Sequence, residues 1–173
     1  MHEPQFRGNE QKYVNDAIES TFVSSVGAYV DRFEADVAEY TASNRAIACV
    51  NGTSALHAAL HVAGVGKGDE VITQPISFVA TANAIALCGA EPAFVDVEQE
   101  TCGMSPDALL ACLQGVAERR SDGCFNKQTG KRISACVPVH VFGHPLRIRE
   151  IVEICNKFQI PIVEDGAESL GST

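Results

Sequence analysis

The chain contains no tryptophan, and aromatic residues make up only 6% of its 173 residues. It also lacks any uninterrupted apolar run of the roughly 18 residues that a membrane-spanning helix needs. Its first residues, MHEPQFRGNEQKY, are polar and do not contain the apolar core of a signal peptide. We therefore expect a cytoplasmic protein that does not enter a membrane.

Basic residues are also scarce. The chain has 13 Lys and Arg against 22 Asp and Glu, a net charge of −9, which argues against nucleic-acid binding. Its seven cysteines contain no C-x-x-C pair of the kind found in zinc and redox sites. Reduced thiols and no metal site are expected. With 46% hydrophobic residues, the chain is long enough to bury one sizeable core.

The residues that are present predict strands and helices in alternation. Apolar runs predict strands over 46–50, 71–72, 92–97, 133–143 and 161–165. Helical spacing and capping residues predict helices over 28–43, 53–64, 77–89, 105–120 and 146–160, with a polar loop or hairpin over 121–132. Continuous apolar strands that alternate with helices are typical of a parallel sheet covered on both faces. The expected fold is three-layer α/β/α.

In such sheets ligands bind beyond the carboxyl ends of the strands, which makes residues 51–54, 74–78, 140–143 and 165–168 candidates. Gly52 permits a turn after the first run, and Thr53 and Ser54 then begin a helix. A helix start favours an anion such as phosphate, although an ordinary N-cap explains the same residues. The stretch matches neither a Walker loop nor a G-x-G-x-x-G fingerprint.

The other candidates are an aromatic ring, a histidine and two acids. Phe78 would either stack on a planar ligand or belong to the core, and His140 would either bind a ligand or cap a carbonyl. Asp165 ends an apolar run, so its charge needs a cation or a strong donor unless it is solvated. The protonated ring of pyridoxal phosphate is such a cation, and Glu168 lies one turn further on.

Several segments in this order resemble the N-terminal part of the large domain in the DegT/DnrJ/StrS-type aminotransferases. They are FVSSVGAYVDRFEADVAEYT, NGTSALHAAL, GDEVITQPISFVATANAI, FVDV, VPVHVFG and IVEDGAESLG. The stretch NKQTGKRI is similar to the LegC-type branch. These are pyridoxal-phosphate enzymes with the aspartate-aminotransferase fold (fold type I).

The resemblance assigns roles by position. It implies that Thr53 and Ser54 hold the cofactor phosphate, Phe78 stacks on the ring and Asp165 pairs with the ring nitrogen. It also implies that Glu168 lies near the ring hydroxyl, that His140 belongs to the cofactor site, and that the segment of Gly27 approaches the substrate.

The resemblance further implies a division of the chain and a reaction. Residues 1–45 would be an N-terminal helical segment, residues 46–173 the βα units of the cofactor site, and the small C-terminal domain would be absent. The substrate would be a nucleotide-linked 4-keto-6-deoxy sugar for surface polysaccharide synthesis, with glutamate as amino donor. The enzyme would be a homodimer.

In this family a Schiff-base lysine follows the EDGAESLG segment, and this chain has no lysine after Asp165. The chain therefore resembles the first part of a longer enzyme, and poor stability alone is expected because apolar surface would be exposed. The alternatives are a non-catalytic remnant that binds cofactor or a partner subunit, or a dehydratase of the family with histidine in place of the lysine. An unrelated nucleotide-binding domain would need a glycine fingerprint.

Overall fold

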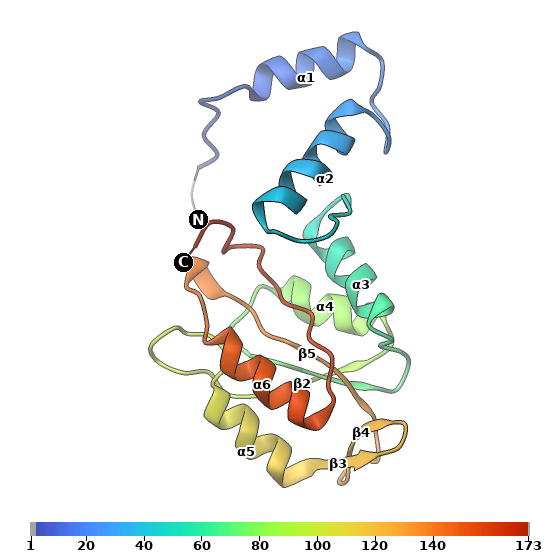
Figure 1. Cartoon of the computed structure of the whole chain (residues 1–173), viewed down its shortest axis with the longest axis vertical. Coiled ribbons are helices and arrows are strands. Elements are labelled where there is room, and N and C mark those ends of the chain that lie inside the picture. Colours follow the sequence, from blue (N-terminus) through green and yellow to red (C-terminus); the bar gives the residue numbers. More distant parts are fainter. Residues whose placement is uncertain (1–2, 173) are drawn as a thin grey trace. The chain divides into compact units, whose positions relative to one another are not determined.

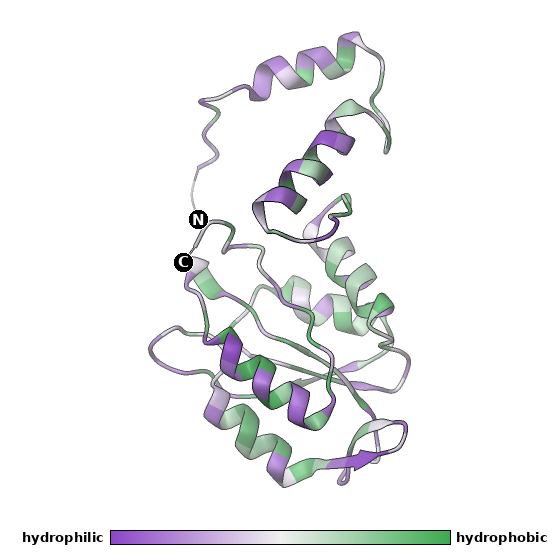
Figure 2. Ribbon diagram, viewed as in Figure 1, coloured by the Kyte–Doolittle hydropathy of each residue, from purple (hydrophilic) through white to green (hydrophobic). Residues whose placement is uncertain are grey.

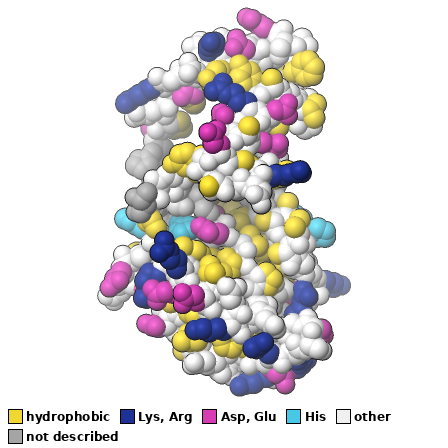
Figure 3. Space-filling view, viewed as in Figure 1, with side chains coloured by type: hydrophobic (Ala, Val, Ile, Leu, Met, Phe, Trp, Pro, Cys, Tyr) yellow, Lys and Arg dark blue, Asp and Glu magenta, His cyan; other side chains and the backbone are white. Residues whose placement is uncertain are grey.

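The computed structural model describes residues 3–172, and the chain divides into two compact units, Met1–Cys49 and Val50–Thr173. The first unit contains helices α1 (Glu10–Glu19) and α2 (Ala28–Tyr40), so the predicted helix over 28–43 is confirmed. Neither helix buries a residue. Their apolar side chains therefore stay on the surface, where Figure 3 shows them beside charged ones.

The second unit is built on a three-stranded parallel sheet of order β2-β1-β5 (Figure 1). Its strands are β1 (Glu70–Thr73), β2 (Glu91–Phe94) and β5 (Ile133–Val137). Its helices are α3 (Gly52–Val62), α4 (Val79–Leu87), α5 (Pro106–Val116) and α6 (Ile148–Phe158). None of the helices between residues 3 and 172 is long and apolar enough to cross a bilayer.

Side chains that alternate along the strands divide the core into two parts. Val71 and Val137 pack with residues of α3 and α4, such as Leu60 and Ile85. Their neighbours in sequence point the other way, so that Cys136 packs with Leu109 of α5 and with α6. Figure 2 shows the corresponding hydrophobic and hydrophilic faces of α6. The predicted three-layer α/β/α architecture is confirmed.

The start of α5 follows the sequence signals, but its end does not. The Ser105 hydroxyl caps the helix by accepting the Ala108 N–H at 3.2 Å, and Pro106 occupies the first turn. The helix was expected to run to residue 120, which is wrong. Residues Ala117–Arg120 form β3, which pairs antiparallel with β4 (Gly123–Asn126). The Arg120 guanidinium lies over the Phe125 ring, and this cross-strand packing favours the hairpin over another helical turn.

The strand predicted over 46–50 is wrong. This run has no regular secondary structure, and Ile47 and Val50 are 75% and 89% exposed. No strand pairing within the described residues includes it. An apolar run without a neighbouring strand has no partner for its backbone hydrogen bonds and does not form sheet.

The strand predicted over 161–165 is only partly formed. The segment lies parallel to the end of β5, but through two isolated bridges, Cys136 to Ile162 and Val139 to Asp165. Pro138 lies between these bridges and has no N–H to donate, so the ladder is interrupted. The second bridge nevertheless places Asp165 at the carboxyl end of the sheet.

Candidate functional site

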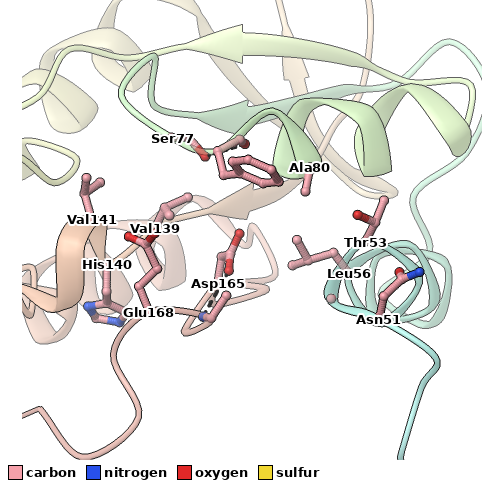
Figure 4. Close-up of a pocket in the computed structure, with 13 residues that line it drawn as sticks. Asn51, Thr53, Leu56, Ser77, Ala80, Val139, His140, Val141, Asp165 and Glu168 are labelled. Carbon is pink, nitrogen blue, oxygen red and sulfur yellow. Dashed lines mark hydrogen bonds between the residues drawn. The ribbon is translucent and has the colours of Figure 1, made fainter. Parts of the chain in front are cut away.

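A cavity of about 340 Å³ opens where the segments after β1 and β5 meet the start of α3 and the loop 165–168 (Figure 4). Five of the predicted residues line it, namely Thr53, Phe78, His140, Asp165 and Glu168. Ser54 is not among the lining residues. The grouping agrees with the rule that ligands bind beyond the carboxyl ends of parallel strands.

Asp165 is the buried acid of this cavity, with 7% of its surface exposed. Its Oδ2 accepts the Thr81 hydroxyl proton at 2.8 Å, and its Oδ1 accepts the Ala167 N–H at 3.2 Å. It makes no ion pair with any described residue. A buried carboxylate with two neutral donors and no cation is suited to a positively charged group brought by a ligand.

The start of α3 presents backbone donors to the cavity. Asn51 is the N-cap, and its Oδ1 accepts the Ser54 N–H at 2.8 Å. The amides of Gly52 and Thr53 have no acceptor within the described part of the chain. Both residues line the cavity, so these amides and the positive end of the helix dipole are suited to an anion.

Phe78 precedes α4 at the edge of the cavity and is 74% exposed. The alternative that it belongs to the core is therefore wrong. A largely exposed ring on a cavity wall offers its face to a planar ligand.

His140 is buried, and both of its ring nitrogens have protein partners. Nδ1 accepts the Leu146 N–H at 3.1 Å, so the proton is assigned to Nε2, which donates to Glu164 Oε1 at 2.7 Å. His140 thus connects the segment after β5 to Glu164, the residue next to Asp165, by a hydrogen bond. It can offer a ligand only its ring surface.

Glu168 lies on the far side of the cavity from α3 (Figure 4). Its Oε2 accepts the N–H of Phe142 at 2.7 Å. Phe142 has φ of 56°, within the short 3₁₀ turn Val141–Gly143, a left-handed conformation that side chains other than glycine rarely adopt. The carboxylate therefore stabilises a strained turn that also borders the cavity.

The comparisons with known proteins agree with this geometry. The model of the DegT/DnrJ/EryC1/StrS aminotransferase family matches residues 4–173. The chain belongs to this family. GDP-perosamine synthase of Vibrio cholerae is 35% identical over 172 residues, which cover 99% of this chain and 42% of that protein.

Solved structures of the family share the fold. The aminotransferase from Psychrobacter cryohalolentis matches with a TM-score of 0.83 and 30% identity, over 100% of this chain and 40% of that one. NtdA from Bacillus subtilis, solved with bound cofactor PMP, matches with a TM-score of 0.75 and 26% identity, over 94% of this chain and 34% of that one. The chain thus spans about two fifths of the first relative's length. The expected fold type I, and the dependence of the family on pyridoxal phosphate, are confirmed.

The described residues fit this cofactor of the family. Asp165 faces the cavity and has no cation among its described neighbours, and the ring of Phe78 is exposed at the edge of the cavity. The amides of Gly52 and Thr53 lack acceptors among the described residues. These features correspond to a protonated ring nitrogen, a phosphate and an aromatic plane.

Three polar residues that support the site were given no role from the sequence, although Asn51 and Gln74 lie in the candidate stretches 51–54 and 74–78. Asn51 caps α3, Thr81 holds Asp165, and Gln74 is fully buried behind them. The Gln74 Oε1 accepts the N–H groups of Met104 at 2.9 Å and Val139 at 3.2 Å, which ties the segment after β1 to two other segments. Asn51 carried a readable signal, because asparagine before a helix is a preferred cap.

Proposed function

We propose that the cavity of the second unit binds pyridoxal phosphate and that residues 46–173 form the cofactor-binding part of a sugar aminotransferase. The observation that carries the proposal is Asp165, a buried carboxylate that faces a cavity without a cation among its described neighbours. When bound, the cofactor supplies an electron sink for transferring an amino group. Asp165 keeps the ring nitrogen protonated by providing the opposite charge.

The other residues bind and orient the cofactor. The amides of Gly52 and Thr53, helped by the Thr53 and Ser54 hydroxyls, hold the phosphate. Phe78 stacks on one face of the ring, and Glu168 accepts a hydrogen bond from the ring hydroxyl or the substrate amine. His140 fixes the chain on which Glu164 and Asp165 lie.

Membership of this family supports a proposal for the substrate and partners. We propose a nucleotide-linked 4-keto-6-deoxy sugar as amino acceptor, glutamate as donor, and a role in surface polysaccharide synthesis. The name of the Vibrio cholerae relative, GDP-perosamine synthase, supports a nucleotide sugar. A homodimer is proposed, in which the segment of Gly27 approaches the substrate.

The proposal is tested by binding of pyridoxamine phosphate to the chain, measured by calorimetry. This probe carries the ring and the phosphate but forms no covalent bond with lysine. Asp165→Asn is expected to weaken binding about 30-fold or more, because it removes the charge that faces the ring nitrogen. The matched control is Asp122→Asn, an exposed acid on the β3–β4 turn, which should bind like the wild type. Absence of saturable binding, or equal binding by Asp165→Asn, would refute the proposal.

A further inference from the structure

A chain of two hydroxyl groups leads from the cavity wall to Asp165. The Ser77 Oγ lies 2.9 Å from the Thr81 Oγ1, which in turn lies 2.8 Å from the Asp165 Oδ2. Ser77 lines the cavity, whereas Thr81 is only 1% exposed and lies behind the wall in α4. Thr81 therefore acts on the cavity only through its neighbours.

The position of the Thr81 proton follows from its two partners. An ionised carboxylate can only accept, so the single Thr81 proton must point to Asp165. Thr81 Oγ1 is then left as an acceptor for the proton of Ser77. Two hydroxyls that donate in one direction strengthen each other, and the chain of donors ends on the carboxylate.

The same hydroxyls can reverse when the acid is neutral. A protonated Asp165 would donate to Thr81, and Thr81 would then donate to Ser77. The Ser77 proton has a second acceptor ready, the Phe78 carbonyl oxygen at 3.0 Å. The direction in which the two hydroxyls donate thus depends on whether Asp165 carries a proton. A cation in the cavity favours the arrangement in which Ser77 donates to Thr81 and Thr81 donates to an ionised Asp165.

Thr81 does not make the bond that a threonine inside a helix usually makes. Such residues commonly donate to a backbone carbonyl one turn earlier in the helix. The Thr81 hydroxyl instead reaches an acid 84 positions away in sequence. Together with the Ala167 N–H on the other oxygen, it fixes how the carboxylate of Asp165 is turned.

We propose that Thr81 is a positioning residue, with Ser77 behind it, that orients the carboxylate of Asp165 toward a protonated ring nitrogen. The inference rests on the proposed function, because it assumes that pyridoxal phosphate occupies the cavity. It assigns to Thr81 a role in distinguishing a ring that carries a basic nitrogen from one that does not.

The experiment compares two probes on the intact chain, pyridoxamine phosphate and its 1-deaza analogue, in which carbon replaces the ring nitrogen. The wild type is expected to prefer the nitrogen-containing probe at least 30-fold. Thr81→Val has nearly the same shape without the hydroxyl, and should reduce this preference about tenfold while binding of the deaza analogue changes little. Thr81→Ser keeps the hydroxyl and should retain the preference.

The outcomes separate the two proposals. If Thr81→Val weakens both probes equally, Thr81 is merely structural and this inference is wrong, while the proposed function stands. If the wild type does not distinguish the probes, pairing with Asp165 is wrong and both proposals fail. Circular dichroism checks that Thr81→Val folds. If Thr81→Val does not fold, Ser77→Ala replaces it in the experiment and should reduce the preference for the nitrogen-containing probe about threefold. If Ser77→Ala weakens both probes equally, this inference is wrong.

Discussion

At the scale of single residues, Asn51 serves both the helix and the proposed phosphate site. Its side chain caps α3 through the Ser54 N–H, and the residue also lines the cavity. Asn51→Ala is expected to lower the free energy of unfolding by about 1 kcal/mol, because an N–H at the helix start loses its acceptor. Urea unfolding measures this loss, and calorimetry should show weaker binding of pyridoxamine phosphate.

The substitution Asn51→Asp separates the two roles. Aspartate caps a helix as well as asparagine does, so stability should be retained. Its added negative charge would lie beside the Gly52 and Thr53 amides and should weaken binding of the phosphate-bearing probe about tenfold. If this variant binds like the wild type, the phosphate does not sit at the start of α3.

Sequence reasoning found the residues of the cavity that follow strands, but not those behind them. Asp165 and Phe78 could be predicted because Asp165 ends an apolar run and Phe78 lies shortly after a predicted strand, and parallel strands end at a common edge. The roles of Thr81 and Gln74 could not be predicted, although Gln74 lies in the candidate stretch 74–78, because these roles depend on partners far away in sequence, such as Asp165 and Met104. A single sequence contains no signal for such a pairing.

At the scale of elements, an ion pair joins the loop after β2 to the start of α6. Glu98 Oε2 accepts from Arg147 Nη2 at 2.6 Å, and the Thr101 hydroxyl donates to Glu98 Oε1 at 2.8 Å. Burial raises the pKa of Glu98, but the hydrogen bonds from Arg147 and Thr101 and the positive charge outweigh it, so the pKa lies below its usual value.

This lowered pKa predicts a pH dependence. The stabilisation is fully present above the ordinary glutamate pKa of about 4.3 and is lost as the pH falls through the lower value of the folded state. Glu98→Gln should lower the free energy of unfolding by about 1 kcal/mol at pH 7, a value reduced because Arg147 is partly exposed, and this cost should be smaller at pH 3. Urea unfolding at both pH values measures the difference.

Glu118 provides the matched control, since its pair with Arg120 is half exposed. Glu118→Gln should change stability by a few tenths of a kcal/mol at either pH. An equal loss for Glu98→Gln at pH 7 and pH 3 would show that the ion pair does not hold the loop.

The elements that sequence patterns predicted best are those whose partners are local. The cap at Ser105 needs only the next three residues, and α5 begins where it was expected. The segment 46–50 has the composition of a buried strand, but sheet requires a second strand, and apolar composition does not supply one. The end of α5 failed for a related reason, because the cross-strand contact of Arg120 with Phe125 competes with helix.

At the scale of the whole molecule, the positions of the lysines limit what the cavity can do. Of the second unit's four lysines, Lys67, Lys127 and Lys157 are exposed, and Lys131 pairs with Glu91 at 2.6 Å. None of the four lines the cavity. An aldehyde held with its ring nitrogen at Asp165 therefore has no amine of this unit beside it to bond with.

Borohydride reduction after incubation with pyridoxal phosphate tests this arrangement. We expect partial labelling spread over the exposed lysines, identified by peptide mass spectrometry, with no lysine modified stoichiometrically. An excess of pyridoxamine phosphate should leave this pattern unchanged, because it would occupy the cavity and not the surface lysines. A single stoichiometric adduct that pyridoxamine phosphate suppresses would mean that a lysine reaches the cavity. The chain would then carry the amine that transamination requires, in addition to the residues that hold the cofactor.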